Sequence, residues 1–148
     1  MDKDELVREI ERRYLPALHS EEINISAAFP AVKAEVRSQA YGDRSDPAGY
    51  TIALAGFFPG APTDQSDEVT LELSFAGIWG PKPLLEAAVF WGHPGGEVEV
   101  NLFQGEVPMS HDALTRLDAE LPRLLQVFRD AVRRGRPPTR PQCSRTNQ

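Results

Sequence analysis

Hydrophobic residues change their spacing twice along this chain, and the changes divide it into three parts. Near the start they recur every four residues, at Leu6, Ile10, Tyr14 and Leu18. This spacing is typical of an amphipathic helix. From Val32 to Phe103, many apolar residues alternate with polar ones, which is the period of a half-buried strand. From Leu114 to Ala131 the spacing returns to three and four, which predicts a second helix.

The first helix meets a proline before its apolar stripe is complete. Pro16 cannot donate to the helical hydrogen-bond ladder, so we predict that the helix ends or kinks near residues 14–15. On this interpretation, residues 19–22 form a polar loop after the helix. Residues 23–31 then form a connector, anchored by Ile25 and Phe29.

The middle of the chain predicts five strands, at residues 32–41, 50–58, 68–75, 84–91 and 97–103. The fourth is ambiguous, because the letters LLEAA suit a helical turn while AVFW suits a strand. We interpret it as a strand because it is short and ends at a turn. Short connections favour neighbouring antiparallel strands, so we expect a meander.

The second helix is bounded by clear signals. Ser110 is a natural N-cap, with Met109 and Leu114 at the two positions of a hydrophobic staple. Gly135 suits the residue just after the helix, and Pro122 predicts a kink or two collinear segments inside it.

We therefore predict an α+β fold. A five-stranded antiparallel meander sheet is flanked by an N-terminal helix and a long C-terminal helix, which pack on one face of the sheet (α-β-β-β-β-β-α). That face carries Val69, Leu71, Leu73 and Phe75. Residues 1–138 form a single α+β domain, and residues 139–148 form a flexible basic tail rich in proline and arginine.

Composition and charge narrow the class of protein. The chain is 41% hydrophobic and 26% charged, which is typical of a globular domain. Its net charge is −6, with thirteen acidic and three basic residues from Asp43 to Glu120. An acidic body repels nucleic acid and favours a basic partner. The charged N-terminus, the single cysteine and the lack of a long apolar stretch predict a cytoplasmic protein that binds no membrane.

Few residues suggest a reaction centre. His93 lies in a glycine-rich turn beside Trp91, where it is either an acid or base or simply a polar hairpin residue. His111 and Asp112 open the last helix, where the helix dipole alone accounts for an acidic residue. Cys143 lies in the tail without a base in its own segment. We expect no metal site, no cofactor and, on balance, no enzyme.

The outward face of the sheet is a stronger candidate. Small residues there, including Ala53, Ala55 and Thr70, predict a shallow trough, with large aromatic residues at its ends and polar groups between them. The expected partner-binding residues are Phe57, Glu72, Phe90, Glu99, Asn101 and Phe103. The alternative is an ordinary solvated sheet face with a few aromatic residues covered by loops.

Two resemblances accompany these patterns. The stretch YTIALAGFFPGAP from Tyr50 to Pro62, followed by His93-Pro94, resembles the β-meander of ubiquitin-conjugating enzymes. Those enzymes carry a catalytic cysteine shortly after the His-Pro turn. Residues 98–106 contain no cysteine, so the resemblance does not extend to transfer chemistry. The small acidic α/β form is also similar, in architecture and charge alone, to secretion chaperones and bacterial immunity proteins.

The sequence thus favours a non-enzymatic protein-binding module whose acidic surface recognises a basic or amphipathic partner protein. The alternative is a small enzyme or ligand-binding protein with a pocket around Trp91, His93, His111 and Asp112. We also expect a homodimer, formed through helix or first-strand surfaces and not through the fifth strand.

Overall fold

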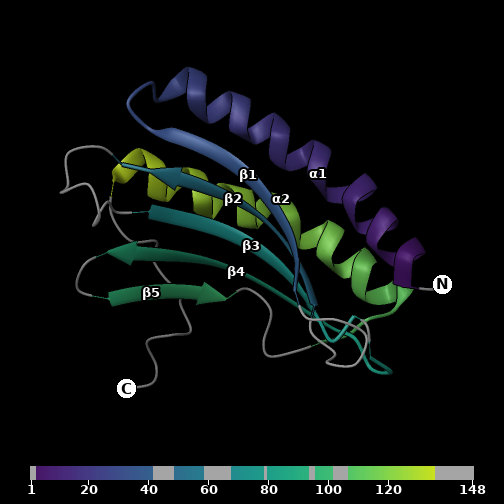
Figure 1. Ribbon diagram of the computed structural model, residues 1–148. Helices are drawn as coiled ribbons and strands as arrows, with labels where there is room; N and C mark the ends of the chain where they lie inside the picture. Colours follow the sequence, from purple (N-terminus) through teal and green to yellow (C-terminus); the bar gives the residue numbers. More distant parts are fainter. Residues whose placement is uncertain are drawn as a thin grey trace.

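A computed structural model of the chain describes residues 3–41, 49–58, 68–78, 80–93, 96–101 and 107–135. Along the chain, one helix precedes the described strands and a second helix follows them (Figure 1). The elements are α1 (Lys3–Ala28), β1 (Lys33–Tyr41), β2 (Gly49–Phe57), β3 (Glu68–Ala76), β4 (Leu84–His93), β5 (Gly96–Asn101), β6 (Val107–Pro108) and α2 (His111–Arg134).

The strands pair antiparallel with their neighbours in the chain. Strands β1 to β4 follow one another in the sheet, and the backbone of β5 pairs with β4. Strand β6, which the sequence did not predict, pairs with the beginning of β4. The predicted α+β class, with an antiparallel sheet and two helices, is confirmed, and residues 84–91 are a strand rather than a helical turn. The predicted tail at residues 139–148 lies outside the described residues.

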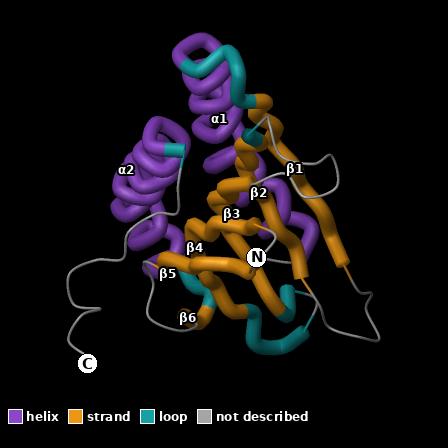
Figure 2. The backbone as a smooth tube through the Cα atoms, turned by 90° about the vertical axis from the view of Figure 1, so that its left-hand side faces the viewer, coloured by secondary structure: helices purple, strands orange, loops and turns teal. Residues whose placement is uncertain are grey.

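The third strand separates two environments. Its residues alternate between buried and half-buried along the whole strand. The buried set, Val69, Leu71, Leu73 and Phe75, shares one core with residues of both helices. Helix α1 contacts β1 and β2, and α2 contacts β3 and β4 (Figure 2). The predicted stripe of α2 is confirmed, because Leu114, Leu117, Leu121, Leu124, Phe128 and Ala131 are all buried.

The predicted end of the first helix is wrong. Helix α1 passes through Pro16 and continues to Ala28, so residues 19–22 are helical and not a loop. Pro16 removes one ladder hydrogen bond, but it lies on the exposed side of the helix. The buried stripe continues beyond it through Leu18, Glu21 and Ile25. Packing of this stripe on the sheet offsets the loss of one backbone bond.

Helix α2 has the predicted boundaries. The Ser110 side chain accepts a hydrogen bond from the Ala113 amide at 3.1 Å, which caps the helix. Gly135 has a φ of 66°, and its amide donates to the carbonyl of Ala131 at 2.9 Å. The helix is continuous through Pro122, which is exposed.

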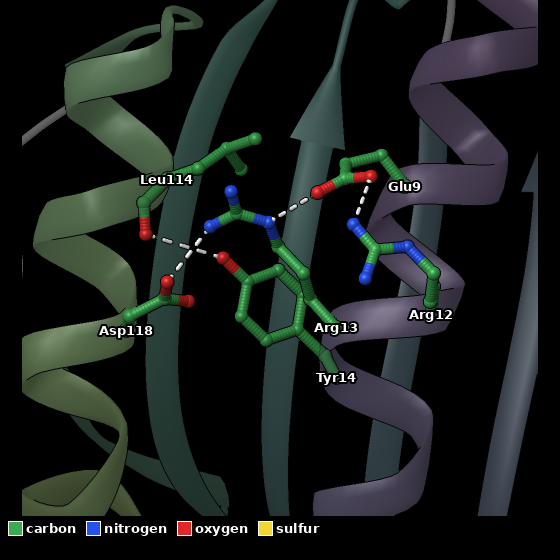
Figure 3. A network of polar contacts seen from close by, with 6 residues as sticks. All are labelled: Glu9, Arg12, Arg13, Tyr14, Leu114 and Asp118. Atoms are coloured by element: carbon green, nitrogen blue, oxygen red, sulfur yellow. Dashed lines mark hydrogen bonds and ion pairs between the residues drawn. The ribbon is translucent and has the colours of Figure 1, made fainter.

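A polar network joins the first halves of the two helices (Figure 3). The Arg13 guanidinium donates to Glu9 at 2.6 Å and, across the interface, to Asp118 at 2.7 Å. The buried Tyr14 hydroxyl donates to the Leu114 carbonyl at 3.3 Å. Burial raises the pKa of Tyr14 above its ordinary value. These bonds tie the first halves of the two helices together.

A second polar contact joins the later halves. The Arg129 guanidinium forms two parallel hydrogen bonds with the Glu21 carboxylate, at 2.7 and 2.8 Å. Glu21 is the one buried charged residue among those described, with 4% of its side chain exposed. Donation to the Glu21 carboxylate raises the pKa of Arg129. This bidentate geometry is the strong form of an arginine–carboxylate pair.

Candidate functional site

The sheet has a second face, opposite the helical core, and the register defines its rows. Paired residues on neighbouring antiparallel strands lie on the same face. One row crosses Glu35, Ala55, Thr70 and Phe90. The rows on either side contain Phe57 and Glu68, and Arg37 and Glu72. We call this surface the open face.

Arg37 contacts three other side chains of the open face. Its Nε donates to Glu35 at 3.2 Å, its Nη1 lies 3.6 Å from Glu68, and its guanidinium stands 5.0 Å from the centre of the Phe57 ring. Arg37 and Glu68 lie two strands and two rows apart, so the side chain crosses Ala55 between them. Ala55, in the strand and the row between them, is 0% exposed.

Beside Arg37 the open face is hollowed. A cavity of about 240 Å³ is lined by Arg37, Glu68, Thr70, Glu72, Phe90 and Gly92. At about 30 Å³ for each water of the liquid, this is room for about eight waters. The floor is made by the short residues Thr70 and Gly92, and the walls by longer side chains. We call this cavity the sheet hollow.

One carboxylate of the sheet hollow, that of Glu68, is held in place by its neighbours. The Thr70 hydroxyl donates a hydrogen bond to Oε2 of Glu68 at 2.6 Å. The same oxygen forms the ion pair with Arg37. Glu68 and Glu72 are separated on β3 only by residues 69–71, with Thr70 between them on the same face. Beside the Arg37 guanidinium, which pairs with Glu68, the hollow therefore presents two carboxylates and one aromatic ring, groups that suit a cation.

The structure brings together some of the residues expected to bind a partner. Glu72 and Phe90 line the sheet hollow, and Phe57 lies under the Arg37 guanidinium at its rim. The β5 backbone pairs Glu99 with Phe90 and Asn101 with Ala88, which places both positions beside the hollow. Phe103 lies outside the described residues.

The residues of the alternative pocket are not brought together. Trp91 is buried in the core, with its ring 5.1 Å from that of Phe58. His93 ends β4, whereas α2 with His111 and Asp112 starts beside the beginning of β4, because Met109 bonds to Pro83. A ten-residue strand spans roughly 30 Å, so the two halves of this pocket lie far apart.

A second cavity, of about 480 Å³, lies between the first turns of the two helices. Its walls are Leu6, Glu9, Arg13, Pro83, Met109, Ser110 and Leu114. The polar groups there serve the fold: Arg13 bridges Glu9 and Asp118, and Ser110 caps α2. This cavity is larger than the sheet hollow, but its chemistry is mainly that of packed aliphatic side chains.

Arg37 and Glu68 lie within the predicted strands 32–41 and 68–75, but the contact between them was not predicted. A weak signal was present. Each lies at the polar position of an amphipathic strand, and the strands are joined by short connections. In an antiparallel pair, long side chains also reach diagonal neighbours, but which diagonal they choose depends on register.

Within the described part of the chain, no group of three or more His, Cys, Asp or Glu residues is arranged to hold a metal ion. Neither of the two described helices is long and apolar enough to cross a membrane. Comparison with protein-family models, with curated proteins and with solved structures finds no match to this chain.

Proposed function

We propose that this protein is a binding module whose open face holds a partner protein, and that a basic side chain of the partner enters the sheet hollow. The observation that carries the proposal is the hollow itself. Two carboxylates, Glu68 and Glu72, stand on either side of Thr70, and the ring of Phe90 forms a wall beside them. Carboxylates and an aromatic face together bind a cation more strongly than either group alone.

The charge of the open face supports a basic partner. On strands β1 to β4 its rows carry four carboxylates, of Glu35, Glu68, Glu72 and Glu86, against two cations, Lys33 and Arg37. The whole chain carries a net charge of −6. An acidic surface of this kind steers a basic partner during the encounter and repels nucleic acid.

The aromatic residues supply apolar contact area. Phe57 and Phe90 are half-buried side chains on a face that carries mostly polar and small residues. Large half-exposed aromatic residues surrounded by polar groups are typical of protein-binding surfaces. They suit an amphipathic partner, whose apolar residues cover the rings while its basic residues meet the carboxylates.

The proposal includes the finer architecture that the sequence predicts. A five-stranded meander with both helices on one face leaves the other face open to a partner. A single domain over residues 1–138 then acts as the binding unit, as in an immunity protein or a secretion chaperone. The pocket around Trp91 and His93 is not included, since its residues lie at both ends of β4.

The test uses two short peptides of opposite charge. One carries two arginines and a leucine in a serine background, and its twin has glutamate in place of each arginine. Each is titrated into the labelled protein while the amide signals of the sheet and of α2 are followed by NMR. We expect the basic peptide to shift the amides of Thr70, Glu72 and Gly92, and the acidic twin to shift none of them.

Two results would overturn the proposal. If both peptides shift the same amides equally, charge plays no part in recognition. If the basic peptide shifts only the amides of α2, the binding surface is on the helical side. The variant Glu72→Gln, with Glu22→Gln on α1 as a matched loss of one carboxylate, locates the effect on the sheet hollow.

A further inference from the structure

We propose that the sheet hollow is a guanidinium site and that Arg37 is its built-in competitor, occupying part of the site that an arginine side chain of the partner takes. This inference rests on the proposed function and names the chemical class of the group that is recognised. It explains why a predominantly acidic face carries an arginine that leans across the sheet toward its own hollow.

The contacts of Arg37 show how this face holds a guanidinium, and one of its partners, Glu68, also lines the sheet hollow. The planar group stands 5.0 Å from the centre of the Phe57 ring and is paired with two carboxylates, those of Glu35 and Glu68. An arginine can stack on a ring and bind carboxylates at once, because its five donors lie in the plane of the group. A lysine ammonium has neither the planarity nor the fork, so the same site discriminates against it.

Part of the receiving site is fixed before any ligand arrives. The Thr70 hydroxyl donates a hydrogen bond to the Glu68 carboxylate at 2.6 Å, and both residues lie on the regular strand β3. Phe90 and Glu72 complete the hollow on the side away from Phe57. Groups that are already oriented lose less conformational freedom when a ligand binds.

The hold on Arg37 is loose enough for exchange. Its side chain is 43% exposed, and its Nη1–Glu68 distance of 3.6 Å exceeds the 2.7–2.9 Å typical of a strong charge-assisted hydrogen bond. Both carboxylates it contacts are also partly exposed, so water screens the pairs. An incoming guanidinium replaces contacts of the same kind, and the cost of displacing Arg37 is small.

If Arg37 competes for the sheet hollow, its removal should increase the affinity of the hollow for an arginine side chain. The probe is N-acetyl-arginine amide, titrated by NMR against the wild-type protein and the variant Arg37→Met, which keeps an apolar stem over Ala55. The control is Arg12→Met, which removes the same charge from α1, where Arg12 pairs with Glu9 on the helical side. We expect the dissociation constant of the probe to fall about fivefold in Arg37→Met. In Arg12→Met it stays within about twofold of the wild-type value.

A second titration, with a lysine probe, tests whether the site prefers a guanidinium to an ammonium group. N-acetyl-lysine amide should bind the wild-type protein and Arg37→Met more weakly than the arginine probe does. If Arg37→Met does not fold, Arg37→Lys replaces it. That variant keeps the charge but loses the stacked plane, and it should still bind the arginine probe more tightly than the wild-type protein.

The outcomes separate this inference from the proposed function. If the basic peptide of the preceding test binds the open face but Arg37→Met binds the arginine probe no more tightly than Arg12→Met, the competitor role is wrong and the basic recognition stands. Equal binding of the two amides would overturn the guanidinium assignment. If neither the peptide nor either amide binds the open face, both the inference and the proposed function fail.

Discussion

Arg129 and Arg37 each pair with a glutamate, yet they stand in opposite regions of the molecule. Arg129 clamps the two helices through two hydrogen bonds of 2.7 and 2.8 Å to Glu21, whose side chain is 4% exposed. Arg37 lies on the open face, where its distances to carboxylates are 3.2 and 3.6 Å and both partners are partly exposed. Both contacts join an arginine to a glutamate, but they differ in the burial of the carboxylate and in the distances between the charged groups.

The difference separates a region whose contacts stabilise the fold from one whose contacts are weak enough for the recognition proposed above. A buried carboxylate needs its bidentate partner, because an unpaired charge away from water is costly. An exposed pair is screened, so it contributes little to the fold and exchanges easily with another ion. The ion pair on the helical side therefore contributes more to stability than those on the open face, which are free to exchange as the proposed function requires.

The largest expected effect concerns the core beneath the helices. Leu73→Ala should lower the free energy of unfolding by about 2–5 kcal/mol, because Leu73 is fully buried and its removal leaves a cavity. Ser74→Ala, the next residue on the opposite face, should change it by less than about 0.5 kcal/mol. Chemical denaturation measures both. If both variants lost the same free energy of unfolding, the two faces of β3 would not differ in their contribution to the core.

The clamp between the helices should come next. Glu21→Gln should lower the free energy of unfolding by about 1–2 kcal/mol, since the amide keeps one acceptor oxygen without charge and loses the other hydrogen bond. The 42% exposure of the Arg129 side chain keeps the loss below that of a fully buried pair. Glu35→Gln is the matched variant on the open face, and a larger loss there than in Glu21→Gln would reverse the comparison.

Alkaline pH should weaken the helical side through its tyrosines. Burial and a hydrogen bond to Glu11 raise the pKa of Tyr50 from 10.0 to about 12. The folded protein therefore holds this proton more tightly than the unfolded chain. The resulting stability is complete below about pH 10 and is lost as the pH rises to about 12. Thermal unfolding of Tyr50→Phe should show a shallower decline over this range, and an identical decline would contradict the assignment.

The smallest effect should come from the open face. Arg37→Met should change the free energy of unfolding by no more than about 0.5 kcal/mol, because its ion pairs are exposed. The measurement is the same denaturation curve as for Leu73→Ala. A loss as large as that of Glu21→Gln would show that Arg37 serves the fold, and it would remove the basis for calling its contacts exchangeable.

Much of the fold was predictable because periodicity reports burial directly. The alternation in β3 and the three-four spacing in α2 fixed both elements and their buried faces. The continuation of α1 beyond Pro16 was not predicted. The local cost of a proline is visible in the sequence, whereas the packing of Leu18, Glu21 and Ile25 that offsets it depends on the tertiary structure. Glu21 itself follows the spacing of that stripe, and this was the available signal for a buried charge.

The candidate site was predictable only in part. Alternation correctly placed Glu72 and Phe90 on the face opposite the core, where they line the sheet hollow. The reach of Arg37 across Ala55 to Glu68 depends on the register of three strands, which no local pattern encodes. The proposed pocket of Trp91 and Asp112 grouped residues by chemistry, although the chain separates them along the full length of β4.

The central claim is that the open face recognises a basic side chain through the carboxylates of the sheet hollow. The most direct measurement is the affinity of the basic peptide for Glu68→Gln and for Glu22→Gln, which lose the same charge on opposite sides of the sheet. We predict that Glu68→Gln weakens binding by about fivefold or more, while Glu22→Gln stays within about twofold of the wild-type protein. Equal affinities of the two variants would contradict the claim.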